Sequence, residues 1–253
     1  MQVRSQLGTD EDQSIGPPPA PHLGHPSSQI RIGVGVTYPA RVTYPARVTS
    51  PASVSTFQEI SYRPAYHGLD DPDKGYLKGS QIVFGDIQLR YDSIRGIRLQ
   101  NLDIINIVSL SPRDQLFKPL SFKIQTGWTR KSFPNNNDQL VYQLNPGVGL
   151  TFPMGRLGVT YALTEANLNV GNSTQLGLGV QTGLLTDVTP YWKSHLMMEA
   201  MFYEWEDQFH ENKLSAVQTF SIHQAYSLSL SLSKENGTFK NQSEAKIHWN
   251  HYF

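Results

Sequence analysis

Apolar and polar residues alternate along most of the chain. Between residues 225 and 233 an apolar set occupies every second position and serines fill the positions between: Tyr226, Leu228, Leu230 and Leu232. The same period of two runs through residues 120–128, 142–152 and 175–184. Because successive side chains of a strand point to opposite faces, this pattern predicts strands with one apolar face.

About twelve such segments follow one another, with little room for helices between them. They lie near residues 29–37, 55–66, 80–92, 95–109, 118–131, 139–152, 156–165, 173–185, 190–205, 212–223, 225–234 and 238–253. Proline, glycine, asparagine and aspartate cluster between them, as turns require. The alternation changes phase within 97–110, which predicts a β-bulge. The order of elements predicts an all-β antiparallel meander.

Three features favour a membrane barrel over a soluble sandwich. The polar face is rich in glycine, serine, glutamine and asparagine, as a crowded or wet lumen would be. The segments reach the roughly 9–11 residues with which a tilted strand crosses hydrocarbon. Closure would also remove the two edges of an open sheet. We therefore predict a closed up-and-down barrel of the outer-membrane type with about 12 strands and its apolar residues facing lipid; a soluble twelve-strand protein is the alternative.

Charged residues within the segments fall mainly on the polar face. The predicted lumen-facing set comprises Arg31, Glu59, Arg63, Asp86, Arg90, Lys123, Lys193 and Glu199. Their mixed signs predict ion pairs that fill the lumen as a plug and leave no wide channel.

The final strand carries the most specific local signal. Ile247, Trp249 and Phe253 share one parity, and the chain ends in an aromatic residue, as in the terminal signal read by the barrel assembly machinery, although His251 interrupts the apolar series. Other aromatics are expected at the girdles or in the wall: Tyr62, Tyr91, Trp128, Tyr142, Tyr161, Trp192, Phe202 and Tyr226.

Two stretches of low complexity divide the chain. Residues 1–28 are predicted to be a Pro-rich disordered linker or remnant, with His22 and His25 as solvated histidines, and 29–253 to be the barrel domain. A six-residue unit with proline in each copy spans 37–54 and predicts an expanded loop. With both termini periplasmic, that loop would lie outside the cell, where protease would cut at Arg41 and Arg47.

Composition narrows the partners. Twenty-one basic residues balance twenty-one acidic ones, which gives no electrostatic case for nucleic acid. The absence of cysteine excludes disulfides and thiolate metal sites. No apolar run is long enough for a membrane helix, and the first sixteen residues do not form a signal peptide. We expect the chain to be the C-terminal piece of a longer precursor, in the outer membrane of a Gram-negative bacterium.

Motifs for catalysis, cofactors or metals are missing from the sequence. There is no nucleophile elbow, phosphate loop or zinc-protease helix. Residues 70–75 resemble the start of a calcium loop without its later ligands and predict a turn. We therefore predict no catalytic, cofactor-binding or metal residue. A barrel hydrolase of the outer-membrane phospholipase kind is an alternative, with Ser221 and His223 as its candidate residues.

Four short motifs carry a family resemblance: residues 29–35, 61–67, 70–76 and 108–113. Together they resemble the C-terminal domain of Gram-negative Lnb-type proteins (domain of unknown function 4105), which are related to a lipoprotein N-acyltransferase. The resemblance spans nearly all of 17–253 but not the N-terminal enzyme domain, so no catalytic residue is carried over. It implies a non-catalytic barrel that anchors or presents a periplasmic enzyme domain, with lipid and a periplasmic domain or lipoprotein as partners. A small pore or transporter is the alternative.

Overall fold

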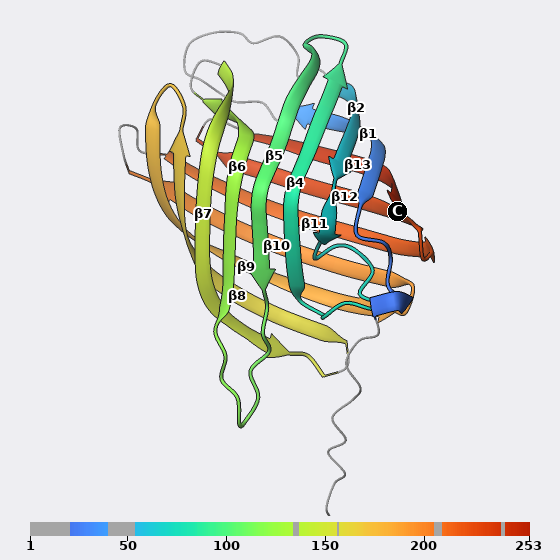
Figure 1. Ribbon diagram of the computed structural model, residues 1–253. Helices are drawn as coiled ribbons and strands as arrows, with labels where there is room; N and C mark the ends of the chain where they lie inside the picture. The colour runs from blue at the N-terminus through green and yellow to red at the C-terminus, as the bar shows by residue number, and fades with distance from the viewer. Residues whose placement is uncertain (1–20, 40–53, 134–136, 156, 205–208, 239–240) are drawn as a thin grey trace, which may run out of the picture.

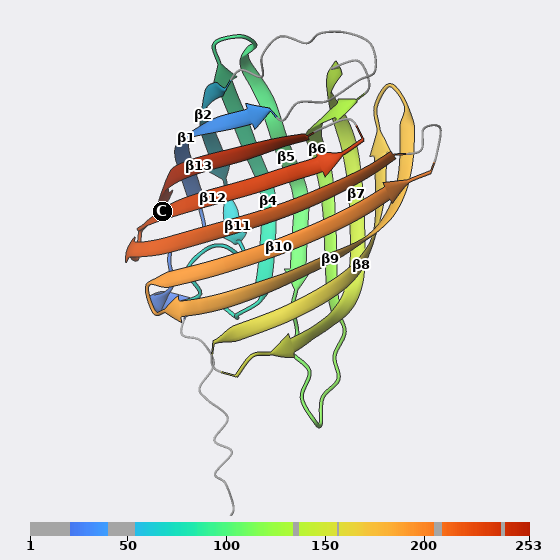
Figure 2. The ribbon, with the colours of Figure 1, turned by 180° about the vertical axis from the view of Figure 1, so that it is seen from behind.

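The chain forms a closed β-barrel (Figures 1 and 2). The computed structural model describes residues 21–39, 54–133, 137–155, 157–204, 209–238 and 241–253. Its strands are β1 (Gln29–Pro39), β2 (Ser55–Arg63), β3 (Ala65–His67), β4 (Ser80–Asp92), β5 (Gly96–Ser109), β6 (Ser121–Phe133), β7 (Asn137–Pro153), β8 (Gly158–Val170), β9 (Thr174–Thr189), β10 (Trp192–Tyr203), β11 (Phe209–His223), β12 (Tyr226–Gly237) and β13 (Asn241–Tyr252).

Each strand pairs antiparallel with its neighbours; β2 pairs with β4, and β1 pairs with β13, so the first and last strands meet and the ring is closed. Strands β2 and β3 both pair with β4 and are two parts of one wall strand, interrupted at Pro64, which has no N–H to donate to the ladder. The ring therefore has twelve strands, and the predicted fold class is confirmed. Within the described residues no helix is long and apolar enough to cross a membrane.

The alternation of the sequence places apolar side chains on the outer wall and polar ones inside. Leu178 and Val148, which a two-sheet stack would bury, are 68% and 48% exposed. The inward-facing residues of the same strands are buried, among them Gln175, Gln181 and Asn145. A polar lumen inside an apolar wall is the architecture of a protein of the Gram-negative outer membrane.

Glycines on the lumen side let large side chains lie flat against the wall. A Cβ on Gly33 would stand 2.1 Å from the His248 ring, and one on Gly35 would stand 2.3 Å from the Phe57 ring. The predicted bulge is present in β5, where the register shifts against β4 at Gln88/Leu89 and against β6 at Asp103/Ile105.

The two ends of the barrel differ. We call the end that holds Ser28 and Phe253 the near rim and the opposite end the far rim. At the near rim the connection from β3 to β4, residues 68–79, folds into the barrel, and we call it the plug loop (Figure 1). Ser28 and Phe253 exchange backbone hydrogen bonds there, 3.2 and 3.0 Å long.

The N-terminal segment enters the barrel before the first strand. A 3-10 turn at Pro21–Leu23 leads into residues 24–28, and His25 is only 5% exposed. The interpretation of His25 as a solvated linker residue is therefore wrong, because the plug loop and β13 cover it; His22 is exposed. Residues 1–20 of the predicted linker and 40–53 of the repeat loop, including Arg41 and Arg47, lie outside the described residues.

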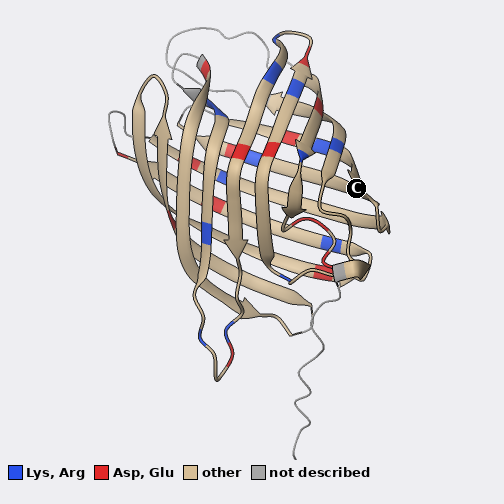
Figure 3. Cartoon of the chain, viewed as in Figure 1, with Lys and Arg blue, Asp and Glu red and all other residues tan. Residues whose placement is uncertain are grey.

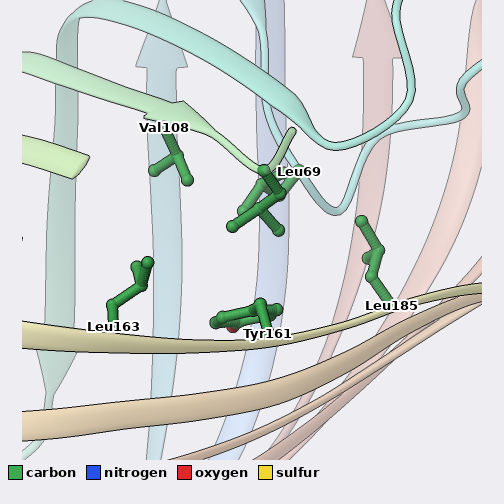
Figure 4. Packing of buried hydrophobic residues seen from close by; sticks show 6 residues of the cluster. Leu69, Val108, Tyr161, Leu163 and Leu185 are labelled. Atoms are coloured by element: carbon green, nitrogen blue, oxygen red, sulfur yellow. The ribbon is translucent and has the colours of Figure 1, made fainter. Parts of the chain in front are cut away.

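A small apolar core lies inside the barrel near the plug loop (Figure 4). Leu69 of the plug loop meets side chains from three strands, namely Val108, Tyr161, Leu163 and Leu185, with Leu110 beside them. The expectation that Tyr161 belongs to a girdle or the outer wall is wrong. Its parity in β8 points inward, where Leu69 provides an apolar contact that water would not.

Candidate functional site in the barrel lumen

Charged residues form a belt across several strands of the barrel (Figure 3). In it, Arg90 of β4 binds two carboxylates: Nε donates to Glu59 Oε1 at 2.7 Å, and the two Nη groups donate to both oxygens of Glu244 at 2.8 and 3.1 Å. Phe57 covers the guanidinium, with its ring centre 3.8 Å from Cζ. Both carboxylates are buried, so Arg90 supplies much of the charge that makes their burial tolerable.

The last strand adds Lys246 and His248 to this cluster. Lys246 lies 3.0 Å from Glu244 and 3.6 Å from Glu59, and His248 Nε2 lies 3.1 Å from Glu59. The cluster joins β2 and β4 to β13 and thus spans the seam, the junction of β1 with β13 at which the first and last strands of the ring meet.

Two further ion pairs lie outside this cluster. Arg31 donates to Asp86 at 2.6 Å and to the Ser61 hydroxyl at 2.7 Å. Lys123 donates to Glu165 at 2.9 Å, with both groups almost fully buried.

The plug loop is tied to the wall through its three aspartates. Asp70 accepts from His195 at 2.7 Å, and His195 in turn contacts the Tyr161 hydroxyl at 2.9 Å. Asp73 accepts from Lys193 at 2.6 Å, and the same ammonium donates to the Asp71 carbonyl at 2.9 Å. These bonds hold the loop against β10.

Asp71 ties the loop to the opposite wall. Its carboxylate accepts from Arg63 at 2.5 Å, the Gly68 N–H at 2.7 Å, the Tyr252 hydroxyl at 3.0 Å and the Gln29 amide at 3.2 Å. Burial by itself would raise the pKa of Asp71, but the nearby Arg63 outweighs it and holds the pKa well below its ordinary value. Burial is likewise outweighed at Asp70, where His195 keeps the pKa low. The loop thus carries ionised carboxylates within reach of fixed cations.

Two histidines meet under the plug loop. His25 Nε2 lies 3.0 Å from His67 Nδ1, and Asp71 lies 4.0 Å from His25 Nε2. The Tyr76 ring stacks on both imidazoles, and its hydroxyl donates to the His25 carbonyl at 2.6 Å. Burial lowers the pKa of His25, which favours the neutral ring.

A polar cavity of about 470 Å³ lies in the lumen, and Arg90, Glu244 and Lys246 form part of its lining. Charges of both signs line it, including Lys123, Lys131, Glu199 and Glu211. Lys131 donates to Glu211 at 3.0 Å and to the Tyr203 hydroxyl at 2.9 Å. The cavity has no one-sided field that would select anions or cations.

The structure places all eight residues of the predicted lumen network on the lumen side. Seven of them form ion pairs, but only Arg90 and Glu59 pair with each other in the cluster at the seam, and only Arg31 and Asp86 form a second pair within the set. Arg63, Lys123 and Lys193 take partners that the sequence reasoning missed: Asp71, Glu165 and Asp73. Glu199 lines the cavity and has no ion-pair partner among the described residues.

The candidate hydrolase pair is not assembled. Ser221 follows the inward parity of Thr219 and faces the lumen. His223 lies beyond a register shift and accepts the Ala225 N–H at 3.2 Å, within the turn to β12. Within the described part of the chain the two side chains share no hydrogen bond.

The residues of the proposed assembly signal lie on the outer wall near the near rim. Ile247, Trp249 and Phe253 are all partly exposed. His251 joins them in an aromatic group, stacked at 4.8 Å on Tyr226 and 5.6 Å from Phe253. A polar aromatic suits the water interface at the strand end, which explains why it interrupts the apolar series.

Comparison with solved structures finds similar outer-membrane proteins. An outer membrane channel from Pseudomonas putida F1 has a TM-score of 0.53 at 9% identity, covering 90% of this chain and 96% of that chain, and this likeness shows the fold alone. The KdgM porin in complex with disordered oligogalacturonate has a TM-score of 0.47 at 5% identity, covering 89% and 99%. The outer membrane channel DcaP of Acinetobacter baumannii has a TM-score of 0.38 at 8% identity, covering 90% and 99%.

Sequence comparison gives a family without a described activity. No curated protein matches the sequence. A family model described as a domain of unknown function (DUF7840) matches residues 18–252.

Proposed function

The chain belongs to the family of DUF7840 domains, and from that premise we propose that it is a non-catalytic outer-membrane barrel that anchors a periplasmic domain of the Lnb type. The observation that supports this most is the plug. The end at which the chain enters the barrel is filled by the plug loop, which is bound to opposite walls. A filled, rigid end can support an attached domain, whereas solutes need an open entrance.

The N-terminal segment strengthens that proposal. His25 is buried between Tyr76 and Tyr252 and fixes the chain inside the near rim. The Gln224 side-chain amide donates a hydrogen bond to the Gly24 carbonyl. The chain that leads to an attached domain would leave the barrel at a defined point on this rim, because these contacts fix Gly24 and His25.

The near rim also presents apolar side chains to solvent. The connection from β5 to β6 projects from the barrel, with Leu116 and Phe117 82% and 72% exposed at its tip (Figure 1). Leu77, Leu157 and Tyr191 are exposed on neighbouring connections. Exposed apolar residues at the tip of a projecting connection are typical of a protein contact. The far rim exposes a smaller pair, Ile94 and Ile97, at the turn from β4 to β5. We assign this rim to the periplasm and the far rim to the cell exterior.

A binding experiment tests the anchor. The barrel is placed in lipid nanodiscs, and a purified Lnb-type periplasmic domain is titrated against it. We expect binding that falls at least tenfold in the double variant Leu116→Asp, Phe117→Asp, and is unchanged in the double variant Ile94→Asp, Ile97→Asp, a similarly exposed apolar pair at the far rim. Absence of binding to the unaltered barrel, or equal loss in both variants, would contradict the proposal.

A small pore is the second candidate, because the far half of the lumen contains the polar cavity. The two functions differ in conductance. The anchor predicts no large, stable single-channel steps in planar bilayers, since the plug loop and the charged belt fill the near half. Such steps from the unaltered protein would favour the pore.

A further inference from the structure

We propose that the paired imidazoles of His25 and His67 bind a divalent transition-metal ion, such as Zn²⁺, which fastens the N-terminal segment to the plug. The site lies outside the charged belt and the polar cavity. It was not expected from the sequence, which separates the two histidines by 42 residues.

The hydrogen-bond partners of the two rings indicate which of their nitrogens bear hydrogen. His25 Nδ1 lies 2.6 Å from the Pro26 carbonyl, which accepts only, so this nitrogen bears the hydrogen. In the neutral ring, Nε2 then has a free lone pair. His67 Nε2 lies 3.6 Å from the Asp73 carboxylate, which favours a hydrogen on that nitrogen and a lone pair on Nδ1. Two lone pairs thus face each other across 3.0 Å, an arrangement that a cation between them stabilises.

The spacing fits a metal ion. Two nitrogens at about 2.0–2.1 Å from one ion lie about 3.0–3.4 Å apart when their bonds are near tetrahedral or square angles. Each ring would also have the outer support that metal-bound histidines commonly have, a carbonyl for His25 and a carboxylate for His67. Asp71 lies near enough to balance charge, although Arg63 and Gly68 already occupy its Oδ2.

The backbone next to His67 has an unusual conformation. The preceding residue, Tyr66, has a φ of +97°, which is unfavourable for a side chain other than glycine. Strain of this kind persists where the surrounding structure demands it, and here it aims His67 at His25.

The ion would add a cross-link between two parts of the chain that are already joined by one backbone hydrogen bond, from the Tyr66 N–H to the Ser27 carbonyl at 3.2 Å. His25 belongs to the N-terminal segment and His67 to β3, next to the plug loop. A bound metal stabilises the folded state by mass action, so it would make the near rim harder to open.

The test uses the refolded barrel in detergent, stripped with EDTA and titrated with ZnCl₂ by calorimetry. We expect one Zn²⁺ per chain, and a rise in Tm of about 5–10 °C at a hundredfold excess over Kd. His25→Ala and His67→Gln should each weaken binding at least tenfold. His22→Ala is the matched control, because His22 is an exposed histidine in the same segment, and it should bind as the unaltered protein does.

Folding of each variant is checked by the mobility shift of the unheated barrel in gel electrophoresis. The Tm shift of the unaltered protein needs no variant and tests the proposal by itself. No heat of binding and no Tm shift would show that the imidazoles share only a proton. Binding that survives both His25→Ala and His67→Gln, or that is lost in His22→Ala, would place the ion elsewhere and overturn the site.

Discussion

Arg90 grips both carboxylate oxygens of Glu244, at 2.8 and 3.1 Å, from the opposite side of the seam at which the barrel closes. The two residues are 154 positions apart in sequence and belong to β4 and β13. The same guanidinium binds Glu59, so one side chain neutralises two buried carboxylates.

Replacing Arg90 by alanine should destabilise the barrel by about 2–3 kcal/mol, because Glu59 and Glu244 would remain buried with only Lys246 and His248 nearby. Unfolding in denaturant, followed by tryptophan fluorescence in lipid, measures the loss. Arg95→Ala is the control: its pair with Asp138 is exposed, and its removal should cost less than about 1 kcal/mol. Equal losses would show that the seam cluster contributes no special stability.

Deleting the plug should open the barrel. If residues 69–76 are replaced by two glycines, the near half of the lumen loses Leu69 and the three aspartates that fill it. We expect single-channel steps in planar bilayers that the unaltered protein lacks. Shortening the connection at 113–118, which projects outside the barrel, should produce no single-channel steps. A plug deletion without single-channel steps would mean that the charged belt alone blocks the passage of ions.

Acid should loosen the plug. The folded-state pKa of Asp70 is below its ordinary value, so its stabilising effect is complete above about pH 4 and is lost as the pH falls through the folded pKa. Hydrogen exchange of residues 68–79, corrected for intrinsic rates, should therefore accelerate below about pH 4. In Asp70→Asn this dependence should shrink, while exchange at neutral pH rises. Exchange that does not change between pH 6 and 3 would contradict the assignment.

The lipid-facing wall should reject charge. Val180 is partly exposed on the outside of β9, so Val180→Arg should destabilise the inserted barrel by about 2–4 kcal/mol. Ser231→Arg places the same side chain in the polar cavity and should have a much smaller effect. The folded fraction after refolding into liposomes distinguishes the two. A reversed order would mean that the two faces of the strands are assigned the wrong way round.

Removing the terminal aromatic should slow assembly. Phe253 stacks on Tyr62 at 6.5 Å, and Phe253→Ala should lower the amount of folded barrel in the outer membrane severalfold. Tyr191→Ala, at an exposed aromatic of the same rim, is the control. If both variants assemble like the unaltered chain, Ile247, Trp249 and Phe253 are not an assembly signal.

The period of two was enough to predict the wall of the barrel. It fixes which residues of a strand share a face, and therefore which charges point into the lumen. The same period also indicates Glu244, Lys246 and His248 as lumen residues. On the last strand they alternate with Ala245, Ile247 and Trp249, which face outward.

The contents of the lumen could not be predicted in the same way. Asp70, Asp71 and Asp73 lie in a connection, where no periodicity indicates direction, and the segment around His25 has the composition of a linker. Tyr161 was assigned outward because parity alone does not separate an apolar contact with lipid from one with a plug. Those positions depend on long-range contacts that the local pattern does not encode.

The mutual hydrogen bonds of Ser28 and Phe253 bear on how the molecule is made. Strands β1 and β13 pair over eleven positions, and each of those pairs joins residues more than two hundred positions apart. Such contacts form late, because most of the conformational entropy of the chain is lost before these contacts stabilise the fold. The rate of zipping this last junction should therefore govern maturation. A circularly permuted gene that links 253 to 28 directly, and opens the ring at a short turn elsewhere, should mature faster.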